Sequence, residues 1–148
     1  MSVLFTDVMT VYNYYRDPDT EKEVWTRSVV RGVQWSHNKS EVAISGNVQT
    51  ENKVEKVAID FQRSYKGNKP YLPPQEYAKL PDEERIAHWT LDAKQGKDII
   101  VLGDSEKEID RDYRIARLFD DFQYVVTVTA VSDNRNRPRL RNIKVVGK

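Results

Sequence analysis

Five acidic side chains at alternate positions have the clearest spacing for chemistry in this chain. They are Asp104, Glu106, Glu108, Asp110 and Asp112. Carboxylates spaced in this way can ligate Ca²⁺, but an EF-hand loop needs glycine at its sixth position and an acid at its twelfth. Counted from Asp104, those positions hold Ile109 and Ile115. The pattern therefore predicts a solvated acidic edge that leads into a helix, and contact with a basic partner is the alternative.

Catalytic constellations are missing from the sequence. His37 and His88 are its only histidines. Neither has the sequence spacing from a nucleophile or a second metal ligand that would indicate a catalytic or metal site. The chain has no cysteine, so disulfides, thiolate catalysis and zinc–thiolate sites are excluded. The glycines form no phosphate-binding loop. We expect a protein that is not an enzyme and that uses no cofactor or metal.

Basic side chains gather at the end of the chain, where four arginines stand at alternate positions. They are Arg135, Arg137, Arg139 and Arg141. In an extended segment they would point the same way, and guanidinium groups bind carboxylates or phosphates through paired hydrogen bonds. Residues 134–148 carry a charge of +6 and the first 133 residues a charge of −5. Docking on an acidic protein surface is favoured. The alternatives are a nucleic-acid contact, which lacks an aromatic stacking platform, and an ordinary solvated strand face.

The elements that must position these residues are mostly β-strands. Strands are predicted over 7–15, 23–35, 42–48, 54–61, 97–102, 124–131 and 140–146, with short helices over 81–89 and 111–122. Trp25, Val29, Val33 and Trp35 are predicted to share one strand face, with a bulge at Gly32. The 148 residues predict one mainly β domain, a small antiparallel barrel or sandwich with one or two short helices.

Residues 62–97 interrupt this pattern and are predicted to be a long extended arm inserted in the domain 1–148. The segment has no sustained strand periodicity, and it is too long for a hairpin loop. Prolines at 70, 73 and 74 favour an extended chain. The aromatic side chains of Tyr71, Tyr77 and Trp89 are predicted to dock this arm on a partner.

Nothing in the sequence predicts contact with a membrane. No stretch approaches the roughly 20 apolar residues of a membrane-spanning helix. The first residues are too short a hydrophobic stretch for a signal peptide and lack a basic start. We expect a cytosolic protein, or one that is assembled from the cytosol.

Three groups of segments resemble a known family. They are 10–13 with 25 and 32–35; 74–80 through 89–91 to 98–103; and 130–135 with 144–146. Together they are similar to small virion proteins encoded among the head–tail genes of tailed bacteriophages and prophages of Gram-positive bacteria. The resemblance spans nearly the whole chain, and none of its motifs is catalytic.

The resemblance implies a structural protein that forms a homo-oligomeric ring at the neck of the virion and is assembled in the host cytoplasm. Its partners would be a portal or adaptor protein on one side and a tail protein on the other, with non-specific contact to packaged DNA. A stopper (head-completion) or adaptor role fits best by analogy of fold. The alternatives are a tail terminator, a minor capsid component or a small nucleic-acid-binding β-barrel. We hypothesise that Arg135, Arg137, Arg139 and Arg141 contact acidic groups, such as Glu106, Glu108 or Asp110, on a neighbouring subunit or on a portal surface.

Overall fold

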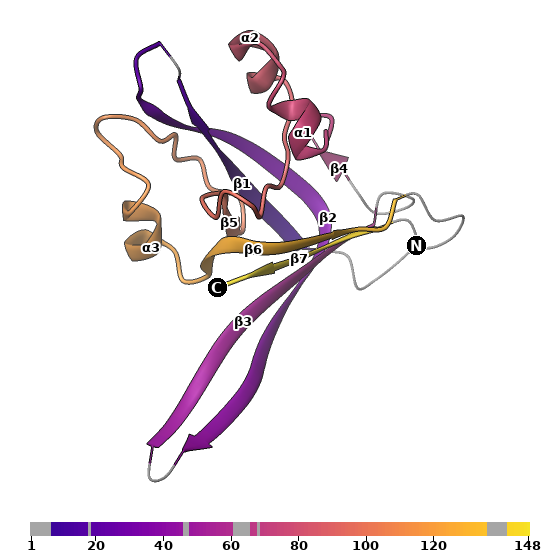
Figure 1. Cartoon of the computed structure of the whole chain (residues 1–148), viewed down its shortest axis with the longest axis vertical. Coiled ribbons are helices and arrows are strands. Elements are labelled where there is room, and N and C mark those ends of the chain that lie inside the picture. Colours follow the sequence, from indigo (N-terminus) through magenta and orange to yellow (C-terminus); the bar gives the residue numbers. More distant parts are fainter. Residues whose placement is uncertain (1–6, 18, 46–47, 61–65, 68, 136–141) are drawn as a thin grey trace.

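The computed structural model describes residues 7–17, 19–45, 48–60, 66–67, 69–135 and 142–148. Its strands are β1 (Asp7–Arg16), β2 (Glu23–Ser45), β3 (Val48–Asp60), β4 (Lys66–Gly67), β5 (Ile99–Leu102), β6 (Val125–Asp133) and β7 (Asn142–Gly147). Its helices are α1 (Pro74–Tyr77), α2 (Asp82–Ile86) and α3 (Arg117–Asp121). The prediction of a mainly β domain is confirmed, with three short helices instead of one or two (Figure 1).

Six of the strands form a closed antiparallel ring. The order around it is β1-β5-β6-β7-β3-β2, and β2 pairs back with β1. The two-residue strand β4 attaches to the middle of β2 outside this ring. Closure gives every long strand two neighbours within the barrel, which removes the exposed edges of an open sheet.

Alternate residues of the strands fill the interior of the ring. The apolar core there contains Met9, Val11, Val30, Val33, Trp35, Val57, Ile59, Ile100, Val126, Val128, Ile143 and Val145. Because successive side chains of a strand point to opposite faces, the residues between them face outward. The outward side chains of β1 and β5 form a second apolar cluster, in which Tyr12, Ile99 and Val101 pack against Leu118 of α3.

A bulge at Gly32 changes which face of β2 is buried. Val33 pairs with Asp7 and Arg31 pairs with Val8, so Gly32 is the extra residue, and its φ of 77° suits glycine. This confirms the predicted bulge. The prediction that Trp25 shares a face with Val33 is wrong, because the extra residue reverses the alternation. Val33 lies in the barrel core, whereas Trp25 packs on the outer cluster.

The β2–β3 pair continues beyond the barrel as a two-stranded projection. β3 pairs with β7 only from Glu55 to Asp60, and its residues 48–54 pair with β2 alone. We call residues 38–45 and 48–54 the hairpin ribbon, and Figure 1 shows it extending away from the ring. At about 3.3 Å per residue, its seven-residue strand reaches roughly 20 Å past the barrel. The strands predicted over 42–48 and 54–61 are therefore parts of two longer strands.

The segment predicted to be an arm closes one end of the barrel instead. The side chains of Trp89 and Leu91 enter the barrel core. Trp89 packs edge-on against Tyr71, with ring centroids 4.8 Å apart, and its backbone N–H donates to the carbonyl of Pro70 at 3.1 Å. For residues 69–97 the arm prediction is wrong, because the aromatic side chains that suggested docking bury themselves in their own barrel. Residues 62–65 and 68 lie outside the described part of the chain.

The predicted helix over 111–122 is shorter in the structure. α3 spans only Arg117–Asp121, and residues 104–116 run over the outside of the barrel without regular structure. Leu118 anchors α3 on the outer cluster, and Ile115 and Phe122 pack beside it. The apolar spacing of residues 111–122 thus predicted which side chains contact the barrel, but it did not predict the length of the helix.

Candidate functional site

Arg135, the one arginine of the predicted basic strip that the structure describes, is held within its own chain. Its guanidinium pairs with Asp133 through Nη2–Oδ2 and Nε–Oδ1 distances of 2.8 and 2.9 Å. It also lies over the ring of Tyr71, with the guanidinium carbon 4.6 Å from the ring centroid. The ion pair lowers the pKa of Asp133 and raises that of Arg135.

These contacts hold the guanidinium of Arg135 beside Asp133 and Tyr71 of its own chain, and its proposed contact with a neighbouring subunit stays a prediction. The other three arginines of the strip, Arg137, Arg139 and Arg141, lie outside the described residues. Their proposed contact with a neighbour therefore stays a prediction.

The acidic residues 104–112 form an exposed edge, as the sequence predicts, but β2 fastens it to the barrel. Asp104 pairs with Arg27 at 3.2 Å and with Arg31 at 2.9 Å. Glu108 lies 3.9 Å from Arg27. Asp110 accepts hydrogen bonds from the backbone N–H groups of residues 112 and 113. Glu106 is exposed. Of the acids predicted to meet a partner, Glu106 is therefore the most open, because Glu108 and Asp110 are engaged within the chain.

A buried hydrogen-bond network beneath the acidic edge fixes its position. The hydroxyl of Tyr12 lies 2.7 Å from Ser105 Oγ and donates to the carbonyl of Lys107 at 2.6 Å. The backbone N–H of Ser105 donates to Thr10 Oγ1 at 2.8 Å, and Arg27 Nε donates to the carbonyl of Ser105. Burial raises the pKa of Tyr12. No local pattern predicts this network, because its partners are more than 70 residues apart in the chain.

Two of the three aromatic residues predicted to bind a partner are buried. Trp89 is 0% exposed and Tyr77 is 4% exposed, and the Tyr77 hydroxyl lies 3.0 Å from Thr26 Oγ1. These side chains stabilise the barrel and cannot reach another protein, which corrects the prediction. Tyr71 is half-buried between Trp89 and Arg135.

A buried polar cluster, which we call the clamp, consists of Asn13 and Asp98 with their hydrogen-bond partners. It holds residues 69–97 in place against the barrel. Asn13 Nδ2 donates to the carbonyl of Thr90 at 2.5 Å, and Asn13 Oδ1 accepts from the Thr90 N–H at 3.1 Å. Asp98 accepts from the backbone N–H groups of Tyr14 and Asp92, both at 2.8 Å, and from Asn13 Nδ2 at 3.1 Å. Burial nevertheless raises the pKa of Asp98 to about 6. Since Asp98 is only 1% exposed, it cannot reach a substrate, and its role is structural.

The described residues offer little for catalysis or metal binding. His88 Nδ1 lies 2.8 Å from the carbonyl of Glu84 in its own helical segment, and the side chain of His37 is outside the described part. Within the described ranges, no group of three or more His, Asp or Glu side chains could hold a metal ion. No helix there is long and apolar enough to cross a bilayer.

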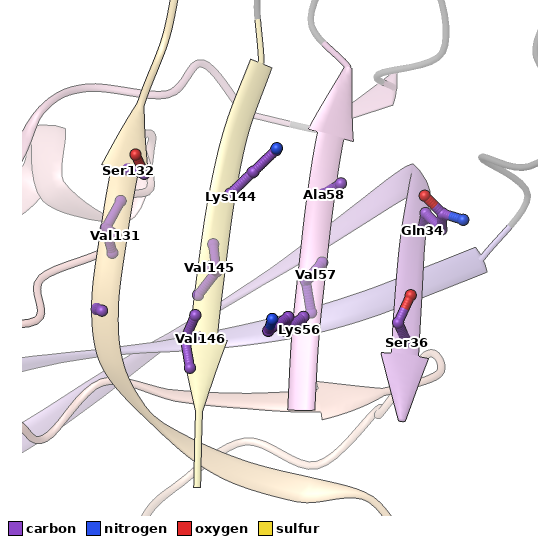
Figure 2. Close-up of a pocket in the computed structure, with 11 residues that line it drawn as sticks. Gln34, Ser36, Lys56, Val57, Ala58, Val131, Ser132, Lys144, Val145 and Val146 are labelled. Atoms are coloured by element: carbon purple, nitrogen blue, oxygen red, sulfur yellow. The ribbon is translucent and has the colours of Figure 1, made fainter. Parts of the chain in front are cut away.

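A shallow groove of about 430 Å³ lies on the outer face of the barrel (Figure 2). It crosses four adjacent strands and is lined by Gln34, Ser36, Lys56, Val57, Ala58, Ala130, Val131, Ser132, Lys144, Val145 and Val146. Small side chains form much of its floor, and Lys56 and Lys144 are exposed. Sequence reasoning missed this groove, because it exists only once β6, β7, β3 and β2 are known to be neighbours.

The hairpin ribbon is the second surface with the properties of a binding site. Its two strands pair with each other over Asn38–Val54 to Ser45–Val48, and no other described strand pairs with either outer edge. Unpaired strand edges present backbone N–H and C=O groups that can pair with another chain.

Comparison with known proteins identifies one family. The model of DUF6751, described as a family of unknown function, matches residues 4–148. No curated protein and no solved structure matches the chain.

Proposed function

The chain belongs to the DUF6751 family, whose function is unknown, and we propose that it is a structural virion protein of a tailed bacteriophage. In this proposal it forms a homo-oligomeric ring at the head–tail neck, between the portal and the tail, as a stopper or an adaptor. A tail terminator or a minor capsid component is the alternative position in the virion. The resemblance of nearly the whole sequence to small virion proteins supports this class of function.

The observation that carries the proposal is the hairpin ribbon. A two-stranded hairpin is only marginally stable in water by itself, and exposed strand edges favour aggregation. A ribbon that reaches roughly 20 Å beyond a closed barrel is therefore best explained by a partner that covers it. A subunit of a ring has such a partner in its neighbour or in the protein on which the ring is built.

The nucleic-acid-binding alternative loses part of its support. It rested on the basic strip, but the ion pair with Asp133 engages Arg135 within the chain. Non-specific affinity for nucleic acid depends on cations that are available to phosphates. The ribbon does not separate the two alternatives, because a two-stranded β-ribbon can also enter a groove of DNA.

Removal of the hairpin ribbon tests the proposal. We would replace residues 38–54 by an Asn-Gly turn, which keeps the barrel pairs Val33↔Ile59 and Trp35↔Val57. The shortened protein is expected to keep its barrel, measured by circular dichroism and thermal unfolding. In a phage that lacks the wild-type gene it should not restore virions, so electron microscopy should show separate heads and tails.

A matched control keeps the ribbon at full length and changes only its tip, with Gly46→Asn and Asn47→Gly. This variant should restore plaques, because the paired strands and their open edges are retained. Normal virions assembled with the shortened protein would contradict the proposed role of the ribbon in the neck.

A further inference from the structure

We propose that neighbouring subunits bind each other by placing α3 of one copy in the groove between Lys56 and Lys144 of the next. This inference rests on the proposed ring and names the contact that builds it. It uses two surfaces of one chain, the groove over β7 and β3 (Figure 2) and the exposed side of helix α3, whose place in the fold Figure 1 shows.

The two surfaces lie on different strands of the ring. Around the ring β1-β5-β6-β7-β3-β2, strand β1 is three places from β7 in either direction, and β5 is three places from β3. α3 packs on the outer cluster of β1 and β5, and the groove lies over β7 and β3. The two surfaces therefore lie on opposite sides of the barrel. A contact between opposite sides is head-to-tail, and repeated contacts of this type produce rings or filaments.

Helix α3 has one buried side and one exposed side. Leu118 is buried and anchors the helix, whereas the next residue, Phe119, is 47% exposed. The adjacent Asp120 is also exposed. α3 thus presents an aromatic ring next to a carboxylate on the outside of the barrel. Exposed aromatic residues of this kind are enriched in protein–protein interfaces.

The groove complements this pair of side chains. Ala58 and Ala130 give it a flat floor of small residues, on which a phenyl ring can pack. Lys144 is paired across the strands with Ala58, and Lys56 with Val146, so the two cations stand at diagonal positions on the floor. Among the described residues, neither lysine is in an ion pair, and no acidic side chain lines the groove. Asp120 of a second copy supplies the missing charge.

Other exposed surfaces of a second copy fit the groove less well. Asp104 and Glu108 of the acidic edge already pair with arginines of β2. Ile86 on α2 is 59% exposed, but it lies beside Tyr15 and Val24 at the β1–β2 hairpin. α3 therefore combines an exposed apolar side chain, a nearby acid and a position opposite the groove.

Disulfide cross-linking tests this contact, and the absence of native cysteine makes the test specific. Two full-length single variants, Ala58→Cys and Phe119→Cys, are mixed and oxidised. A disulfide forms readily only when the two Cα atoms come within about 7 Å. We expect the mixed pair to cross-link at least about ten-fold faster than Ala58→Cys mixed with the control Ile86→Cys. Equal rates would overturn the inference.

Charge exchange gives a second readout of the same contact. Lys56→Glu and Asp120→Lys, each added to the cysteine pair, are expected to slow cross-linking, and the two together to restore part of the rate. Rapid cross-linking of Ala58→Cys with itself would indicate a two-fold contact and would overturn the head-to-tail arrangement.

The two proposals fail in distinguishable ways. If rings form without preferential cross-linking of Ala58→Cys and Phe119→Cys, this contact is wrong and the neck role is unaffected. If the pair cross-links but the chain is absent from virions, the contact is right and the neck role is wrong.

Discussion

Replacement of Trp89 by alanine is expected to lower the free energy of unfolding by about 3–5 kcal/mol. Trp89 is 0% exposed in the core of the barrel, and its ring packs edge-on against Tyr71. The substitution leaves a cavity at the end of the barrel, and the clamp of Asn13 on Thr90 hinders its collapse. Urea denaturation measures the change, and the melting temperature should fall by about 10 °C or more.

The matched control is Ile86→Ala, because Ile86 is 59% exposed on the neighbouring helix α2. It should change the free energy of unfolding by less than about 0.5 kcal/mol. If Trp89→Ala were no more costly than this control, residues 69–97 would not close the barrel. The extended arm predicted from the sequence would then be the better description.

The contribution of Asp98 to stability is expected to fall by about 3 kcal/mol as the pH rises from about 4 to about 7. Burial raises the pKa of Asp98 from 3.8 to about 6, against the three hydrogen bonds that favour its carboxylate. Between these two pKa values the native state keeps a proton that the unfolded state has released. The native state is therefore favoured at low pH and loses this advantage as the pH passes about 6.

Comparison with Asp98→Asn isolates this effect, because the two proteins share every other titrating group. The asparagine places an amide beside the Asp92 N–H, but the cost of that contact does not depend on pH. The stability of the native protein minus that of the variant, measured in urea at several pH values, should decrease with rising pH. If this difference in stability increased with pH instead, the hydrogen bonds would outweigh burial in setting the pKa of Asp98. The clamp would then contain a stable carboxylate.

The sequence predicts the strands well where the pattern is local. The apolar run 99–102 became β5, and the alternation of 7–15 became β1 with one more residue. Glycine at position 32 predicted the bulge. The consequence of the bulge for Trp25 was missed, because it depends on register against β1, which no local pattern specifies.

The projecting element was predicted at residues 62–97, but in the structure it is the hairpin ribbon. The difference has a physical reason. Residues 69–97 lack periodicity because their contacts with the barrel come from single side chains such as Trp89 and Tyr77, far apart in sequence from their partners. The hairpin ribbon, in contrast, has ordinary strand patterning. A period of two shows that a segment is extended, but it does not show whether a neighbouring strand covers it.

The candidate surfaces were only partly predictable. Exposure of the acidic edge follows from its composition, but its attachment to Arg27 and Arg31 requires that residues 104–108 lie beside β2. Arg135 belongs to the regular pattern of arginines. Asp133, two residues before it, is the nearby acid from which an ion pair within the chain could be predicted. The groove needed the ring order of four strands, and this order is not encoded in any one segment.

Cryo-electron microscopy of the neck of purified virions would show whether this chain forms a ring there. We expect a ring of this chain between the portal and the tail, with each hairpin ribbon lying against a neighbouring subunit or an adjoining protein. Density for the chain on the capsid surface or at the tail end would keep the structural class and contradict the neck position. Absence of the chain from the particle would contradict the proposed function and favour the nucleic-acid-binding alternative.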